Sequence, residues 1–149
     1  MTVIVFDGET LAADRRACRG DLHRTVTKIF PFGEELAAIT GDTALGLELL
    51  AWYRGGAKPQ DFPKLDETDD AELIVVAADG TLLLYERKPI PIVFHERKAA
   101  FGCGAKYALG AMAMGADAVQ AALIACQYSV SCGNGIDAYR RGGVKVAVN

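Results

Sequence analysis

The sequence predicts a four-layer α-β-β-α sandwich of the α+β class, in which helices cover the outer faces of antiparallel sheets. Two observations carry this prediction. Short β-rich runs return on themselves through turn signals: Asp7-Gly8, typical of a tight hairpin turn, separates residues 2–6 from residues 10–13. The run 2–6 is also apolar on both of its faces, as expected for a strand in a sheet that is covered on both sides. The 149 residues suit one domain, residues 1–149, with a sizeable core.

The next elements follow from turn and capping signals. Residues 26–30 and 36–40 flank a segment with proline and glycine, and they predict a second hairpin. Asp42 suits the N-cap of a helix with apolar residues at helical spacing, and Gly55-Gly56 suits its end. Residues 57–70 mix prolines, lysines and acidic residues without periodicity, so they predict a surface loop or a weak helix.

The second half of the chain continues with strands and then helices. Asp79-Gly80 marks a third hairpin, and Asp117-x-x-Gln120 resembles a capping box. Small residues before Asp117 allow close approach of a neighbouring element, so the last two helices are expected to pair. The expected elements are strands 73–78 and 81–86 with an extension at 90–94, helices 104–115 and 117–128, and one or two closing strands within 136–149.

Composition and charge exclude several classes of protein. The formal net charge is −3, with 16 basic residues scattered among 19 acidic ones, so no nucleic-acid partner is expected. No apolar run approaches the roughly 20 residues that span a bilayer, and the first residues lack the features of a signal peptide. We therefore expect a cytoplasmic protein without a membrane segment.

The cysteines and histidines do not predict a metal site or a cofactor. The four cysteines lack C-x-x-C spacing and only two histidines accompany them, so reduced thiols and no metal are expected. Cys126 is expected to be a small buried apolar residue, and both histidines, His23 in a loop and His95 at a strand end, to be structural or exposed. The acidic pairs Asp66-Glu67 and Asp69-Asp70 are expected to be solvated.

The start of the chain is the one place that suggests a nucleophile. Met1 precedes the small residue Thr2, a context in which aminopeptidases remove methionine. Thr2 would then carry a hydroxyl and a free α-amine, so a nucleophile and its base would share one residue. The amine has a reference pKa of about 7.7–8.0, which suits proton transfer at neutral pH.

Short segments elsewhere in the chain accompany this start in a recognisable order. They are Thr2-Val3-Ile4-Val5, residues 12–17, Thr27-Lys28, residues 37–42, Gly102-Cys103-Gly104 and residues 132–137. On these segments the chain resembles, over nearly its whole length, the proteasome β-subunit and HslV peptidase family of N-terminal nucleophile hydrolases.

The resemblance implies a set of site residues. Thr2 is the expected nucleophile, Asp14 and Lys28 are expected to flank it, and the N–H of Ala38 is expected to hold the oxyanion. Arg16 matches an arginine that is expected to brace the Asp14–Lys28 pair. A charged Lys28 would stabilise the alkoxide, and Asp14 would keep the lysine charged. The alternative for Asp14 and Lys28 is a surface ion pair between adjacent strands.

The sequence departs from the family pattern at several supporting positions. Ala38 stands where the family usually has glycine, and Cys103 replaces a serine that supports the nucleophile. Ser129 and Cys132 stand where many proteasome subunits have an aspartate and a second serine, although HslV-type members also lack that aspartate. Because a thiol is a weaker hydrogen-bonding group than a hydroxyl, catalysis is expected to be slow.

The resemblance implies a threonine peptidase that hydrolyses peptide or protein substrates inside a self-assembled homo-oligomeric ring. Residues 55–70 leave little room for the family's second helix, which places an ATPase unfoldase partner in doubt. Two alternatives stay open: a non-catalytic ring or scaffold subunit that keeps Met1, and an amidase whose narrow pocket at Ala38 takes a small molecule. Reactive thiols at Cys103 and Cys132 would be a third role.

Overall fold

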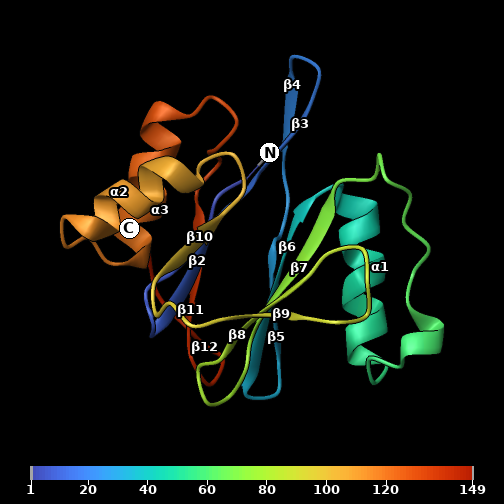
Figure 1. Ribbon diagram of the computed structural model, residues 1–149. Helices are drawn as coiled ribbons and strands as arrows, with labels where there is room; N and C mark the ends of the chain where they lie inside the picture. Colours follow the sequence, from blue (N-terminus) through green and yellow to red (C-terminus); the bar gives the residue numbers. More distant parts are fainter. Residues whose placement is uncertain (1, 149) are drawn as a thin grey trace.

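The computed structural model describes residues 2–148 and confirms the predicted α-β-β-α sandwich. Within these residues, two five-stranded antiparallel sheets pack face to face, with strand orders β10-β1-β2-β11-β12 and β5-β6-β7-β8-β9, and β3 pairs with β4 alone. Helices α2 and α3 cover the first sheet and α1 covers the second (Figure 1). The strands are β1 (Ile4–Phe6), β2 (Thr10–Asp14), β3 (Arg16–Arg19), β4 (Leu22–Thr25), β5 (Ile29–Phe32), β6 (Glu35–Gly41), β7 (Ala71–Val76), β8 (Leu82–Tyr85), β9 (Ile92–Phe94), β10 (Ala99–Phe101), β11 (Ile136–Arg140) and β12 (Val144–Lys145); the helices are α1 (Thr43–Arg54), α2 (Ala105–Ala113) and α3 (Ala118–Tyr128), with a 3-10 turn, η1 (Pro59–Asp61).

Both sheets are covered on both faces, as the doubly apolar run at the start of the chain predicts. Ile4 and Phe6 of β1 belong to the core between the sheets, whereas Val3 and Val5 pack under α2 and α3. Strand β7 repeats the pattern: its even-numbered residues face the other sheet and its odd-numbered residues, such as Leu73, face α1. The alternation of side chains along a strand therefore divides the protein into three hydrophobic layers.

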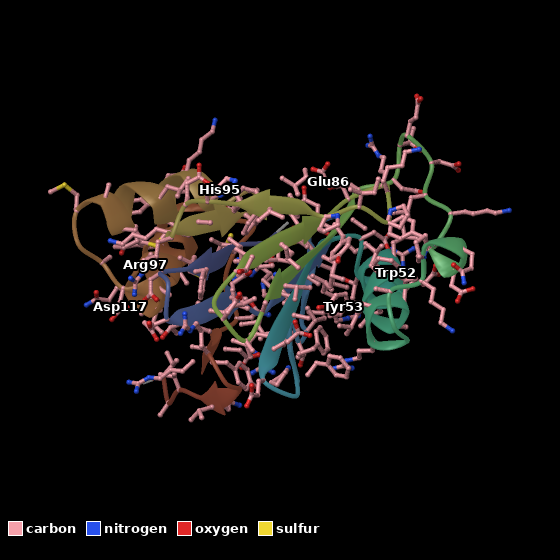
Figure 2. The ribbon with its side chains drawn as sticks, turned by 60° about the horizontal axis from the view of Figure 1, so that its bottom comes forward. Trp52, Tyr53, Glu86, His95, Arg97 and Asp117 are labelled. Carbon is pink, nitrogen blue, oxygen red and sulfur yellow. The ribbon has the colours of Figure 1, made fainter. Side chains whose placement is uncertain are left out.

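The two helical layers are built from different side chains. Fully buried alanines, among them Ala108 and Ala121, hold α2 and α3 close to their sheet. On the other side, Trp52 of α1 packs edge-on against Phe62 and Tyr85, at ring-centroid distances of 4.8 and 5.2 Å. Figure 2 shows Trp52 on α1 in this outer layer. Small residues allow close approach on one face, and aromatic rings fill a wider gap on the other.

Both predicted helix caps are confirmed. The Asp42 carboxylate accepts a hydrogen bond from the Leu45 N–H at 3.0 Å at the start of α1. Asp117 and Gln120 form a reciprocal capping box at the start of α3, with bonds of 2.8 and 3.0 Å. These caps satisfy N–H groups that have no partner within the helix.

Three elements differ from the sequence prediction. The β3–β4 hairpin is not among the predicted strands, because its arginines do not alternate with apolar residues; His23, which was expected in a loop, lies on β4 and is exposed. Strand β10 was also not predicted, since two of its three residues are alanines and its pairing with β1 is a long-range contact. The second hairpin turns at Gly33-Glu34, and its first strand spans Ile29–Phe32 in place of the expected residues 26–30.

No helix in residues 2–148 is long and apolar enough to cross a membrane.

The contact between α2 and β1 depends on the absence of a side chain at Gly104. A Cβ there would lie 2.8 Å from the Val3 Cβ and 2.9 Å from the Cys132 Sγ. We expect Gly104→Ala to lower the free energy of unfolding by about 1–3 kcal/mol through overpacking. Gly110→Ala is the matched control, because that position in α2 has no atom within 4 Å and alanine should raise the free energy of unfolding by about 0.5–1 kcal/mol. Denaturant unfolding measures both, and equal effects would contradict the close approach.

Candidate active site

A cavity of about 710 Å³ opens between the β3–β4 hairpin and the start of α1. Thr2 and Lys28 lie in its wall, together with residues 16–19 on one side and residues 39–44 and Asp70 on the other. The cavity is therefore formed where the two sheets of the sandwich meet the hairpin.

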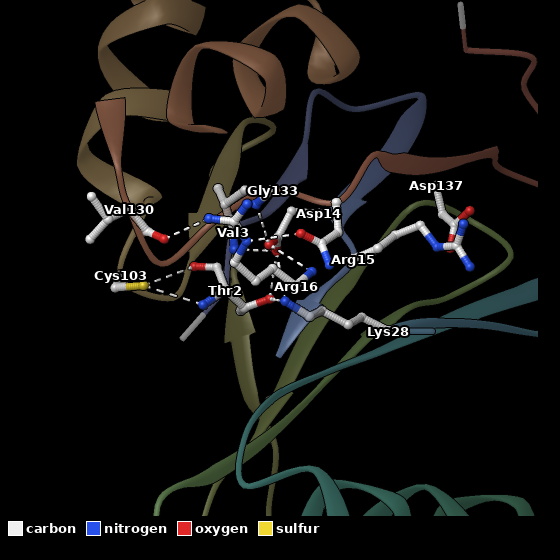
Figure 3. A network of polar contacts seen from close by, with 11 residues as sticks. Thr2, Val3, Asp14, Arg15, Arg16, Lys28, Cys103, Val130, Gly133 and Asp137 are labelled. Atoms are coloured by element: carbon white, nitrogen blue, oxygen red, sulfur yellow. Dashed lines mark hydrogen bonds and ion pairs between the residues drawn. The ribbon is translucent and has the colours of Figure 1, made fainter. Parts of the chain in front are cut away.

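Thr2, Asp14 and Lys28, the three catalytic side chains predicted from the sequence, meet at this cavity (Figure 3). Lys28 Nζ donates to both Thr2 Oγ1 and Asp14 Oδ1, the latter at 2.7 Å. Thr2 Oγ1 in turn donates to Asp14 Oδ1 at 2.9 Å. The relative exposures of Thr2, Asp14 and Lys28 are only 1%, 0% and 5%. A charged group this deeply buried requires partners, and these three supply them to one another.

Asp14 is held by main-chain donors as well as by side chains. Its Oδ1 also accepts the Val3 N–H at 3.0 Å, and its Oδ2 accepts the N–H groups of Arg16 and Gly133 at 3.1 and 3.0 Å. These charge-assisted bonds offset the loss of water around the carboxylate. The pair with Lys28 is therefore a buried ion pair, and not the exposed pair between adjacent strands that the sequence also allowed.

The site joins the two sheets. Thr2 and Asp14 belong to the sheet of β1 and β2, where Asp14 lies opposite Val3 at the end of β2. Lys28 precedes β5 of the other sheet, and its carbonyl accepts the Ile39 N–H at 3.0 Å. The lysine side chain therefore reaches from one sheet to residues of the other.

The loop before α2 wraps closely around the Thr2 backbone. The Thr2 nitrogen donates to Cys103 Sγ at 3.2 Å, and the Thr2 carbonyl accepts the Gly104 N–H at 3.1 Å. Gly102 has a φ of +88°, and a Cβ there would lie 2.3 Å from the Thr2 carbonyl oxygen. Cys103 thus contacts the Thr2 backbone, while Gly102 and Gly104 provide the space for the approach.

Arg16 supports Asp14 in two ways. Its backbone N–H binds the carboxylate directly, while its guanidinium donates to the Asn134 side chain at 3.0 Å and to the Val130 carbonyl at 2.8 Å. These bonds hold the loop that presents the Gly133 N–H to Asp14. A Cβ at Gly133 would lie 2.6 Å from the guanidinium, so this glycine permits the close approach of Arg16.

Ser129 and Cys132 lie behind the site rather than in the cavity. Ser129 ends α3, its N–H donating to the Ala125 carbonyl at 2.8 Å, and its carbonyl accepts the Cys132 N–H at 3.1 Å. Burial raises the pKa of the Cys132 thiol to about 12, and the nearby Asp14 carboxylate acts in the same direction. Cys132 is therefore a protonated, buried thiol that packs against the α2–α3 layer.

Ala38 is not brought into the site. Along β6 the Ile39 N–H points to β5 and the Asp42 N–H points to Asp70, next to β7. Because N–H groups alternate between the two edges of a strand, the Ala38 N–H points toward β7 and away from the cavity. The Ala38 side chain lies in the core between the sheets. The Ala38 N–H, which the resemblance predicts as the oxyanion donor, therefore does not face the cavity.

Sequence reasoning did not assign roles to Gly102, Gly133 and Asn134. The signal was present, because Gly102-Cys103-Gly104 and residues 132–137 were among the segments that carried the resemblance.

Met1, whose removal was predicted, lies outside the described residues. Within residues 2–148 no three metal-ligating side chains gather, and His95 is exposed at the end of β9 (Figure 2).

The fold is an α-β-β-α sandwich of the type found in HslV and proteasome-like structures. No family model matches the sequence, and no curated protein matches it.

Solved structures of this class are similar along almost the entire chain. BPH from Thiobacillus denitrificans in complex with epoxomicin has a TM-score of 0.72 at 18% identity, covering 99% of this chain and 100% of that one. A second structure of the same BPH has a TM-score of 0.71 at 17% identity and covers both chains fully. Eukaryotic HslV from Trypanosoma brucei has a TM-score of 0.70 at 20% identity, covering 93% of this chain and 97% of that one. The fold expected from the resemblance is thereby confirmed.

The buried ion pair predicts a large stability effect at Asp14. We expect Asp14→Asn to lower the free energy of unfolding at pH 7 by about 3–5 kcal/mol, because it removes one partner of a buried pair. Asp137→Asn is the matched control: its pair with Arg15 spans 3.4 Å with the arginine side chain 39% exposed, so the loss should be about 0–1 kcal/mol. Urea unfolding followed by circular dichroism tests this, and similar losses for the two variants would contradict the assignment of Asp14 as the central acceptor.

Proposed function

We propose that the protein is an N-terminal threonine peptidase that acts after removal of Met1. The observation that supports this most is the buried contact of the Thr2 hydroxyl with Lys28 and Asp14 at the wall of an open cavity. A hydroxyl held by a buried ammonium next to solvent-accessible space is suited to nucleophilic attack.

The proposed reaction begins with the free α-amine of Thr2. The Oγ1 proton passes to this amine, Oγ1 bonds to the substrate carbonyl carbon, and the carbonyl electron pair moves to oxygen. The C–N bond then breaks, and the leaving nitrogen takes the proton from the α-ammonium group. Water, activated by the same amine, cleaves the ester on Thr2 and restores the hydroxyl.

The neighbouring groups have separate roles in this scheme. Lys28 stabilises the negative charge that develops on Oγ1, and Asp14 fixes the ammonium in place. Cys103 Sγ, which accepts from the Thr2 nitrogen at 3.2 Å, orients the amine. A thiol accepts more weakly than a serine hydroxyl, which favours a slow enzyme.

We further propose that the protein is cytoplasmic, acts on peptides or proteins and assembles into a homo-oligomeric ring. The likeness to HslV supports the ring, and the open cavity suits an extended chain. Between α1 and β7 the chain forms only the 3-10 turn η1. We propose no ATPase partner.

Covalent labelling tests the nucleophile. We expect epoxomicin, which is bound in the structure of Thiobacillus denitrificans BPH, to add one inhibitor mass to protein whose Met1 has been removed. Thr2→Ser should still react, because it keeps the hydroxyl, and Thr2→Ala should not. Intact-mass spectrometry gives both the state of Met1 and the adduct. If processed protein neither reacts nor hydrolyses a peptide library, the protein is not a threonine peptidase.

Turnover by Lys28 variants tests the stabilising charge. In processed protein, Lys28→Met should lower kcat by roughly 10²–10³ or more, since it removes the charge beside Oγ1. Lys28→Arg should fail almost as badly, because a planar guanidinium does not reproduce a compact ammonium. Lys106→Met, at an exposed position on α2, is the control with unchanged activity. Thermal unfolding establishes that each variant is folded, and a folded Lys28→Met enzyme with full kcat would remove Lys28 from the mechanism.

A further inference from the structure

The β3–β4 hairpin projects from the sandwich without support from a larger sheet. Within residues 2–148 its two strands pair only with each other, and every residue of β4 is exposed. Figure 1 shows it extending beyond the ends of both main sheets. An isolated two-stranded hairpin is marginally stable in water, so this one has a surface that gains from being covered.

The hairpin gathers positive charge that appears scattered in the sequence. Residues 15–24 contain four arginines and one aspartate. Arg15 pairs with Asp137, and the Arg16 guanidinium is occupied by Asn134 and Val130. Among the ion pairs of the described residues, none involves Arg19 or Arg24. Two exposed guanidiniums therefore remain for an acidic partner.

An acidic segment reaches the other side of the cavity at Asp70. Residues 61–72, which lead from η1 to β7, contain six carboxylates and one lysine, and none of these groups takes part in an ion pair of the described residues. Asp66, Glu67 and Asp70 are exposed. Burial raises the pKa of Glu72, with Glu86 and Asp70 adding to the shift, so the negative charges already repel one another within one copy.

These two segments do not meet within one copy. Arg16 and Arg19 line one wall of the cavity and Asp70 lines the opposite wall, and no ion pair joins the two sides. The hairpin of one copy and the acidic segment of the next can meet, because each copy offers both surfaces. Contacts between two different surfaces repeat from copy to copy and close into rings when the rotation allows.

We propose that the β3–β4 hairpin docks on the acidic segment 61–72 of a second copy and forms the head-to-tail contact of the assembly. This rests on the ring in the proposed function and assigns the surfaces that build it. Leu22, 53% exposed on the hairpin, adds an apolar contact. Because Arg16 and Arg19 of the hairpin and Asp70 of the acidic segment line the cavity, the contact lies close to two neighbouring sites.

The charges in this contact determine which surfaces bind each other, and they contribute little to the binding free energy. Exposed ion pairs each contribute little and are screened by salt, whereas like charges placed opposite each other suppress binding. Reversing the charges on one surface should therefore weaken the contact, and reversing them on both surfaces should restore it.

The experiment uses the full chain in five forms: the wild type, three charge-reversal variants and one control variant. The variants are Arg19→Glu/Arg24→Glu, Asp66→Lys/Glu67→Lys and the quadruple combination. Native mass spectrometry and light scattering after size exclusion give the oligomeric state at 50 and 500 mM NaCl. We expect the wild type to assemble, and its assembly to weaken as the salt concentration rises. Each double variant should need at least tenfold more protein to assemble. The quadruple variant should assemble at a protein concentration close to that of the wild type. Lys106→Glu/Lys145→Glu, with the same change in net charge as the hairpin variant, should assemble like the wild type.

Other outcomes overturn the proposal. Double variants that assemble like the wild type, or a quadruple variant no better than the doubles, exclude this contact. A wild type that stays monomeric at every concentration and salt excludes a second copy as the occupant. Circular dichroism establishes folding, and epoxomicin labelling of each processed variant reports the nucleophile separately, so a failed contact is distinguishable from a failed peptidase.

Discussion

The buried pair of Asp14 and Lys28 is the interaction on which the arrangement of this protein depends. Asp14 ends a strand of one sheet and Lys28 precedes a strand of the other, and their contact at 2.7 Å lies beside the hydroxyl of Thr2. Burying two charges is unfavourable unless their geometry is good and their remaining bonding capacity is satisfied. Here main-chain donors from three separate segments provide that satisfaction. The chemistry of the site and the packing of the sandwich therefore share the same atoms.

The hydrophobic layers explain how such a polar site tolerates its position. Three apolar cores separate the two helical layers and the two sheets, and the polar side chains gather where the strands end. Glycines around Thr2 and Arg16 replace side chains where backbone and guanidinium approach closely. Close packing behind the cavity wall limits the positions that Thr2 and Lys28 can take, as the proposed reaction requires.

Much of this could be predicted from local sequence. The β1–β2 hairpin follows from Asp7-Gly8, and the helix starts follow from Asp42 and Asp117, because turn and cap signals act over a few residues. The β3–β4 hairpin could not be predicted in this way, since its arginines do not alternate with apolar residues. Strand β10 depends on β1, almost a hundred residues away in the chain. Ala38 shows a further limit: its place in the sequence suggested the site, but the direction of its N–H depends on which neighbouring strand each edge of β6 faces.

Arg16 has a consequence for communication within the protein. Its main chain begins the exposed hairpin and bonds to Asp14, while its side chain holds the loop that presents the Gly133 N–H to the same carboxylate. Two of the donors to Asp14 Oδ2 thus depend on one residue at the base of a projecting element. The base of the exposed hairpin and the buried carboxylate beside Thr2 therefore share one residue, so the order of the hairpin and the geometry of the site rest on the same contacts.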